Sequence, residues 1–226
     1  MTSVAEVLPR TAGLVTLRIT EIFRSLQGES DRIGWPTVFI RLTGCPLRCV
    51  YCDTAYAFTG GQRQTVPEIL AAVAALKTDM ICVTGGEPLA QPACADLLTA
   101  LCDAGYQVSL ETSGALSIES VDPRVKIVMD LKTPDSGESS KNCFANLAIL
   151  KPTDEIKFVI GSRRDFDWAV EEVDAHQLDR RFMVWCSPVH GAVPPQELAQ
   201  WVLDSGLRLR FQLQLHKLIW GNEQGR

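Results

Sequence analysis

The chain has 226 residues, enough for one domain with a large buried core, and its 46% hydrophobic and 22% charged content is that of an ordinary globular protein. Its net charge of −5 gives no electrostatic case for nucleic-acid binding, which usually needs a basic surface. No apolar run approaches the roughly 20 residues that span a bilayer, and residues 1–13 lack the apolar stretch of a secretory signal. We therefore expect a cytoplasmic protein with a single domain over residues 1–226, flexible over 1–14, and neither a membrane nor a nucleic-acid partner.

Strand-like and helix-like stretches alternate along the chain. In chain order, runs of β-branched and aromatic residues predict strands at 17–23, 37–42, 80–84, 107–111, 126–130, 155–160, 182–186 and 208–215. Helices are expected at 67–76, 93–104, 165–176 and 195–205. The first helix follows a capping box that pairs Thr65 with Glu68. Gly105 and Gly206 suit the positions just after two of the helices.

Repeated strand–helix units indicate an α/β fold with a mainly parallel sheet and helices outside it. Polar or Gly-rich loops follow five of the expected strands, at 44–54, 85–88, 112–114, 130–133 and 187–191. In parallel α/β folds the carboxyl edge of the sheet is where ligands bind, so these loops predict a single site. A full eight-fold barrel is too large for this length, and a partial, open (β/α) barrel with fewer helices fits better.

Three of the eight cysteines cluster, at Cys45, Cys49 and Cys52. Thiolates at CxxxCxxC spacing can reach one 4Fe-4S cluster from a single loop and leave one iron open for another ligand. The alternative is a structural zinc site with a fourth ligand such as His190 or His216. Zinc motifs normally pair two short-spaced couples, and no second couple exists here, so the pattern favours the iron–sulfur cluster.

The other five cysteines are scattered among apolar neighbours. In a reducing compartment isolated cysteines behave as small hydrophobic residues. We expect buried thiols at Cys82, Cys94, Cys102, Cys143 and Cys186.

Two segments together resemble the radical S-adenosylmethionine (SAM) superfamily. They are GCPLRCVYCDT, from Gly44 to Thr54, and TGGEP, from Thr84 to Pro88. The resemblance implies a radical SAM domain whose open iron binds SAM, with no catalytic residue beyond the cluster and SAM themselves. Glycines would let backbone carbonyls approach the SAM ammonium group. The SAM contacts implied are Tyr51, Cys52, Asp53, Gly85, Gly86, Glu87, Ser113, Asp130, Leu131 and Lys132.

A narrower resemblance covers most of the chain and points to the 7-carboxy-7-deazaguanine synthases. It rests on EIFRSLQGES, FIRLTGC, CDT, ETSG and the tail LHKLIWGNEQGR. It implies conversion of 6-carboxy-5,6,7,8-tetrahydropterin to 7-carboxy-7-deazaguanine, a radical ring contraction with loss of ammonia in queuosine or other 7-deazapurine biosynthesis. It also implies catalytic use of SAM, a need for Mg²⁺, an electron donor such as flavodoxin or ferredoxin, and a homodimer.

The same resemblance assigns residues to the pterin and to Mg²⁺. Arg41 would form a paired, charge-assisted bond with the substrate carboxylate. Thr54 would bind Mg²⁺ through its hydroxyl, with substrate and water as further ligands. The implied substrate contacts are Leu26, Gln27, Gly28, Arg41, Thr84 and Arg226.

Three features of the sequence bear on these assignments. Many family members carry Ser-Pro-Lys where this chain has Asp130-Leu131-Lys132, so Asp130 adds a charge beside SAM. The segment after Thr54 is short, which predicts a compact cap over the site. Trp220 and Gly221, after the last expected strand, would lie near the substrate or in the dimer interface.

Two other functions fit the cysteine motif alone. One is an activating enzyme that makes a glycyl radical on a partner protein, which would lack the Gln27 and Arg41 elements and carry a protein-docking surface. The other is a non-enzymatic metal-binding module, which would hold zinc and bind no SAM.

Overall fold

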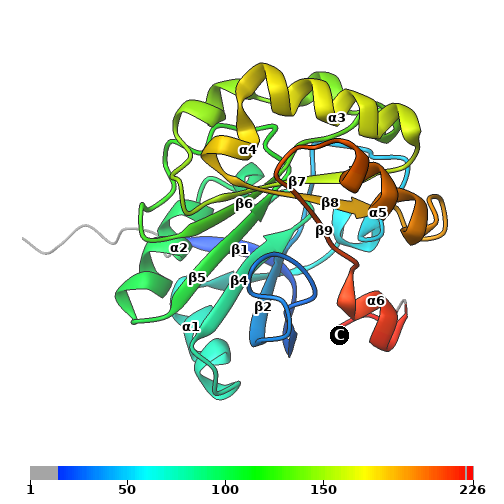
Figure 1. The fold of residues 1–226 in the computed structure, drawn as a ribbon. Coiled ribbons are helices and arrows are strands. Elements are labelled where there is room, and N and C mark those ends of the chain that lie inside the picture. The colour runs from blue at the N-terminus through cyan, green and yellow to red at the C-terminus, as the bar shows by residue number, and fades with distance from the viewer. Residues whose placement is uncertain (1–14, 222, 226) are drawn as a thin grey trace, which may run out of the picture.

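The computed structural model describes residues 15–221 and 223–225, and within them the strands form a single nine-stranded sheet (Figure 1). The strands are β1 (Thr16–Leu26), β2 (Pro36–Leu42), β3 (Gln62–Thr65), β4 (Met80–Gly85), β5 (Gln107–Thr112), β6 (Lys126–Asp130), β7 (Glu155–Ile160), β8 (Met183–Pro188) and β9 (Leu209–Phe211). Their order in the sheet is β3-β1-β2-β4-β5-β6-β7-β8-β9. The predicted flexibility of residues 1–14 lies outside the described residues.

From β2 to β9 every neighbouring pair of strands is parallel, whereas β1 runs antiparallel to both β2 and β3. The edge strands β3 and β9 are not paired with each other in the described part of the chain, so the sheet does not close. The expected α/β fold, a mainly parallel and open partial barrel, is therefore confirmed.

The helices cover the sheet in two groups (Figure 1). They are α1 (Val66–Ala75), α2 (Cys94–Asp103), α3 (Arg163–His176), α4 (Leu178–Arg181), α5 (Pro195–Asp204) and α6 (Leu215–Trp220). One hydrophobic cluster joins α1 and α2 to β1, β2, β4 and β5, and the other joins α3, α4 and α5 to β6, β7 and β8. None of the described helices is both long enough and apolar enough to cross a membrane.

Strand alternation separates this core from the site. On β6, Met129 packs in the core whereas Val128 and Asp130 line a cavity on the opposite face. On β7, Phe158 packs in the core whereas Lys157 lines the cavity. Because successive side chains of a strand point to opposite faces, one face of the sheet binds the helices and the other is left for ligands.

The capping box appears at the start of α1 as predicted. The backbone N–H of Thr65 donates to the Glu68 carboxylate at 2.7 Å, and the Glu68 N–H donates to the Thr65 hydroxyl at 3.4 Å. Gly105 follows α2 with a φ of +87°, a left-handed conformation that favours glycine.

The C-terminal segment differs from the prediction of one strand over 208–215. Strand β9 stops at Phe211, and Leu215–Trp220 forms the helix α6. The reason is tertiary: the Gln212 side chain accepts from the Ser30 N–H and donates to the Ser30 carbonyl, and the Leu215 N–H donates to the Gly28 carbonyl at 3.0 Å. These contacts turn the chain away from the sheet edge.

Two further expectations need correction. Strand β3 was not predicted, because its residues Gln62–Thr65 are polar and show no apolar alternation; it pairs at the sheet edge with β1. Of the five isolated cysteines, Cys82, Cys94 and Cys186 are buried, but Cys102 and Cys143 are only half-buried.

Candidate active site

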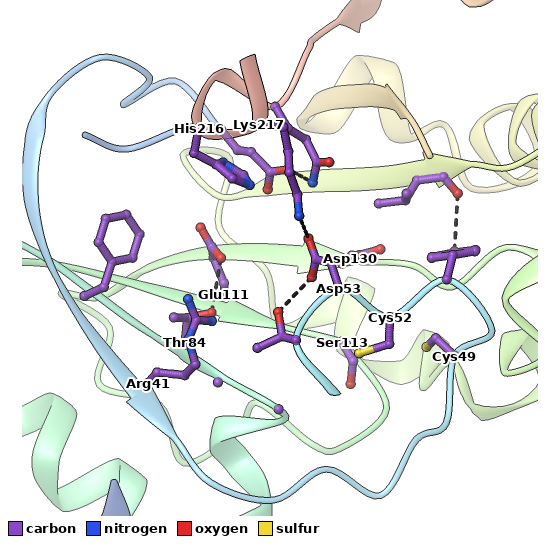
Figure 2. Close-up of a pocket in the computed structure, with 18 of the residues that line it drawn as sticks. Arg41, Cys49, Cys52, Asp53, Thr84, Glu111, Ser113, Asp130, His216 and Lys217 are labelled. Carbon is purple, nitrogen blue, oxygen red and sulfur yellow. Dashed lines mark hydrogen bonds and ion pairs between the residues drawn. The ribbon is translucent and has the colours of Figure 1, made fainter. Parts of the chain in front are cut away.

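A cavity of about 730 Å³ opens at the carboxyl edge of the sheet. Side chains from the ends of β4, β5, β6 and β7 form its floor, the cysteine loop forms one wall, and the segment after β1 and helix α6 close the other sides (Figure 2). Figure 2 shows Cys49 and Cys52 at one end of the cavity and Arg41 and Thr84 toward the other. The loops expected to share this edge therefore meet around one site.

The three clustered cysteines all line the cavity and are half-buried. The Leu47 N–H points at the Cys45 sulfur at 3.4 Å, a contact of the kind that tunes iron–sulfur clusters. Burial raises the pKa of the Cys45 and Cys49 thiols, so iron binding would have to remove their protons. Three thiols on one loop at the mouth of a cavity form a donor set that fits a 4Fe-4S cluster.

The described residues do not form a preorganised zinc site. Among the described residues, no three His, Cys, Asp or Glu side chains are grouped closely enough to hold a single metal ion. In a 4Fe-4S cluster each cysteine binds a different iron, so its ligands do not have to converge on one ion. His190 and His216 both line the cavity, but neither joins the cysteines in such a group.

The TGGEP loop packs directly on the cysteine loop. The Gly86 N–H donates to the Leu42 carbonyl at 3.2 Å, and the Glu87 N–H donates to the Gly44 carbonyl at 2.8 Å. A Cβ on Gly86 would lie 2.3 Å from the Gly44 carbonyl oxygen, and one on Gly85 would lie 2.4 Å from the Leu42 carbonyl oxygen. Only glycine permits this approach, which leaves both residues lining the cavity.

Glu87 does not line the cavity, although the resemblance implies that it contacts SAM. Its carboxylate is completely buried and accepts from the Thr112 hydroxyl, the Leu89 N–H, and both the N–H and the hydroxyl of Ser113. The carboxylate therefore ties the TGGEP loop to the ETSG turn after β5 and places Ser113, which does line the cavity.

The DLK segment after β6 is divided between cavity and core. Asp130 and Lys132 line the cavity and form an ion pair at 2.9 Å, whereas Leu131 is fully buried in the hydrophobic core and does not reach the site. The other carboxylate oxygen of Asp130, Oδ1, is buried and has no hydrogen-bond partner among the described residues. Tyr51 lines the cavity beside them; its hydroxyl contacts the Thr133 hydroxyl at 3.2 Å.

Charge and burial set the pKa values of this group. Burial, with a further contribution from Asp130, raises the pKa of Tyr51 to about 12, so its phenol is neutral. Burial acts to lower the pKa of Lys132, but Asp130, Cys49 and Tyr51 together raise that pKa above the ordinary value. Lys132 is therefore a fixed cation beside the unpaired Asp130 oxygen.

A second polar group surrounds the far end of the cavity. Glu111, near the end of β5, accepts from the Gln27 amide at 3.2 Å and from the Thr84 hydroxyl at 3.2 Å. Gln27 and Thr84 are nearly buried, and all three side chains line the cavity. Leu26 lines it as well; Gly28 does not, because it packs against α6. Glu111 lies in the ETSG segment, but sequence reasoning had assigned it no role.

Arg41 projects from the end of β2 into this region. Its Nε donates to Glu21 at 2.6 Å, and the guanidinium carbon lies 5.8 Å from the Phe23 ring centre and 5.9 Å from that of Tyr56. Burial acts to lower the pKa of Arg41, but the bond to Glu21 raises it. Within the described residues the two terminal nitrogens make no hydrogen bond, so they remain available to a ligand.

Two more cavity residues, Glu29 and Lys157, were not expected. Lys157 Nζ lies 2.5 Å from Glu29 and 3.8 Å from Asp130, and the Gln214 amide donates to Glu29 at 2.8 Å. Burial alone would raise the pKa of Glu29, but Lys157 and Gln214 hold it below its usual range. Glu29 lies in the EIFRSLQGES segment but Lys157 lies in no motif, so only the fold shows that the two side chains pair.

Helix α6 closes the cavity from above (Figure 2). Lys217 reaches down to Asp53 at 3.1 Å, and Asp53 accepts from the Thr54 hydroxyl at 2.7 Å. His216 packs on Gly28, where a Cβ would lie 2.2 Å from its Nδ1. Burial lowers the pKa of His216 and favours its neutral form. Gly221 also lines the cavity, whereas the predicted contact Arg226 lies outside the described residues.

The sequence and the structure were compared with known protein families, curated proteins and solved structures. Residues 39–175 match the model of the radical SAM superfamily. The chain is 45% identical to the 7-carboxy-7-deazaguanine synthase of Chlorobaculum tepidum, over 90% of this chain and 94% of that one, and 42% identical to that of Koribacter versatilis, over 92% and 98%. The crystal structure of QueE from Escherichia coli has the same fold, with a TM-score of 0.75 at 23% identity over 89% of this chain and 95% of that one.

Proposed function

The chain belongs to the radical SAM superfamily and, within it, to the 7-carboxy-7-deazaguanine synthases, and from this we propose that it converts 6-carboxy-5,6,7,8-tetrahydropterin to 7-carboxy-7-deazaguanine and ammonia. The product and ammonia together contain all the atoms of the substrate. The overall reaction is therefore redox-neutral, and SAM can be regenerated in each turnover instead of being consumed. Membership of this family also argues against the glycyl-radical activating enzyme and the non-enzymatic metal-binding module.

The observation that carries the proposal is the polar lining of the far end of the cavity. A tetrahydropterin presents a row of N–H donors on its pyrimidine ring and a carboxylate on the other ring. The buried Glu29 and the half-buried Glu111 can accept from such donors, and the Arg41 guanidinium can donate two parallel hydrogen bonds to the carboxylate. The stacked rings of Phe23 and Phe39, 5.1 Å apart, add an apolar wall that suits a flat ligand.

The cysteine end of the cavity fits the cluster and SAM. Cys45, Cys49 and Cys52 would hold the cluster; when both are bound, cluster and SAM supply the radical that starts the reaction. Gly85 and Gly86 line the cavity, and their backbone carbonyls would bind the SAM ammonium group. The polar groups of SAM would be met by Ser113, Asp130 and Lys132, with Tyr51, Cys52 and Asp53 near the nucleoside.

Mg²⁺ would bind between the two ends of the cavity, at Thr54. Because the Thr54 hydroxyl donates its proton to Asp53, its lone pairs remain free to bind a cation. Mg²⁺ commonly takes few ligands from the protein and completes its octahedron with substrate and water oxygens. The substrate carboxylate, held by Arg41, would be one such ligand.

The remaining expectations concern partners. Generating the radical requires one electron per activation, and a flavodoxin or ferredoxin would supply it. We also propose that the chain is a single radical SAM domain that works as a homodimer in the cytoplasm, with its C-terminal residues, including Arg226, near the substrate.

An anaerobic assay tests the function directly. The reconstituted protein is incubated with 6-carboxy-5,6,7,8-tetrahydropterin, SAM, dithionite and Mg²⁺, and the products are identified by mass. Formation of 7-carboxy-7-deazaguanine that is lost in Cys49→Ala supports the proposal. A protein that cleaves SAM but leaves the pterin unchanged would refute it.

A further inference from the structure

Lys157 is a nearly buried, positively charged residue to which the proposed function assigns no role. It lies in the middle of β7, and its side chain is 12% exposed and lines the cavity. Burial acts to lower its pKa, but Glu29 and Asp130 raise that pKa well above the ordinary value, so the side chain stays charged. A permanently charged lysine is a poor proton donor, which leaves an electrostatic role.

Lys157 is the link between two halves of the site. Its Nζ is 2.5 Å from Glu29 Oε2 and 3.8 Å from Asp130 Oδ2, and Asp130 Oδ2 is in turn 2.9 Å from Lys132. The four side chains form a row of alternating charge across the cavity floor. Glu29 stands at the pterin end and Lys132 at the SAM end.

The two carboxylates in this row differ at the oxygen that Lys157 does not approach. Glu29 Oε1 accepts from the Gln214 amide at 2.8 Å, and the buried Asp130 Oδ1 has no partner among the described residues. Lys157 contacts the other oxygen of Glu29 and lies 3.8 Å from the other oxygen of Asp130, which Lys132 contacts at 2.9 Å. A cation at such a distance offsets part of the desolvation of a buried carboxylate and helps to orient it.

We propose that Lys157 is a positioning residue shared by both ligands, which fixes Glu29 toward the pterin and Asp130 toward SAM. This inference rests on the proposed function, because it assigns the two ends of the cavity to those two ligands. Without the cation, the partners left among the described residues are Gln214 for Glu29 and Lys132 for Asp130, so each carboxylate would turn away from its ligand. Both affinities would then fall together, although Lys157 itself need touch neither ligand.

The chain offers a matched control in Lys126. Its side chain is 17% exposed and also bridges two carboxylates, Asp31 and Glu155, the latter at 2.6 Å. Lys126 does not line the cavity. Loss of a buried ion pair alone should therefore affect Lys126→Met and Lys157→Met alike, whereas loss of ligand positioning should affect only Lys157→Met.

The test measures binding in cluster-reconstituted protein without reductant. SAM is followed by anaerobic equilibrium dialysis, the stable probe 6-carboxypterin by its fluorescence, and stability by thermal melting. Both lysine variants should melt earlier than the wild type. Lys157→Met should weaken both affinities by roughly tenfold or more, Lys126→Met should leave both within about twofold, and Lys157→Arg should recover part of the loss.

The outcomes separate the two proposals. A wild-type protein that fails to bind 6-carboxypterin refutes the proposed function and with it the shared role. If the wild type binds both ligands but Lys157→Met leaves either affinity unchanged, or Lys126→Met lowers both equally, only the role of Lys157 is refuted. If Lys157→Met fails to fold, the same comparison with Lys157→Gln decides the question.

Discussion

Replacing Arg41 with alanine should weaken pterin binding on the order of a hundredfold. The Arg41 side chain is 15% exposed and is anchored by Glu21, which leaves its terminal nitrogens for the substrate carboxylate. Truncating one partner of a buried, hydrogen-bonded charge pair costs about 2–5 kcal/mol, and about 1.4 kcal/mol is a factor of ten. We expect the lower half of that range, because the cavity mouth is open to water and screens the pair.

The assay compares three variants for dissociation of 6-carboxypterin, cluster content and slow SAM cleavage without substrate. Arg41→Lys should recover only part of the affinity, because an ammonium group cannot make a planar two-point contact. Arg124→Ala is the control, since Arg124 is half-exposed, pairs with Asp103 and Asp122, and does not line the cavity. Cluster content and uncoupled SAM cleavage should survive all three changes.

Arg41→Ala should also lower the free energy of unfolding, by about 1–3 kcal/mol, because the Tyr56 hydroxyl is then the one partner left to the Glu21 carboxylate in the described part of the chain. This stability loss must not be mistaken for the binding effect, so affinities are compared well below the melting temperature. Pterin affinity within twofold of the wild type in Arg41→Ala would refute the assignment of Arg41 to the carboxylate.

Three further predictions follow from the site. Cys49→Ala should lose the iron–sulfur absorbance, whereas Cys94→Ala, in the core, should keep it at a modest cost in stability; the reverse result would overturn the cluster assignment. Gly86→Ala should abolish SAM binding, because its Cβ would lie 2.3 Å from the Gly44 carbonyl oxygen, and normal SAM affinity would contradict this packing. Because burial lowers the pKa of His216 below 6.5, the contribution of its neutral form to stability is fully present above that pH and is lost as the pH falls through the lowered value. In His216→Gln the melting temperature should therefore depend less steeply on pH below 6.5. An unchanged slope of melting temperature against pH would argue against a neutral buried histidine.

The parts of the site that the sequence predicts are those carried by local spacing. The cysteine motif places three thiols on one loop whatever the rest of the fold does, and paired glycines after a strand signal a close backbone approach. The buried parallel strands β4 to β8 also lie where the sequence predicts them, because such strands read as short apolar runs. In each case the information lies within a few residues.

The parts that the sequence does not predict depend on distant contacts. Glu29 and Lys157 are 128 residues apart, and nothing near either one indicates the pair. Glu87 reads as a ligand-facing residue in its motif, yet the ETSG turn supplies enough donors to bury it completely. Helix α6 replaces the predicted end of the last strand because residues 28–30 capture the chain there.

The ratio of product to 5′-deoxyadenosine tests the central claim most directly. Under saturating 6-carboxy-5,6,7,8-tetrahydropterin, with limiting SAM, dithionite and Mg²⁺, both compounds are quantified by mass over many turnovers. A redox-neutral ring contraction returns the hydrogen atom to the cofactor, so 7-carboxy-7-deazaguanine should exceed 5′-deoxyadenosine many fold. One 5′-deoxyadenosine formed per product would mean that SAM is consumed in each turnover, and would contradict the account.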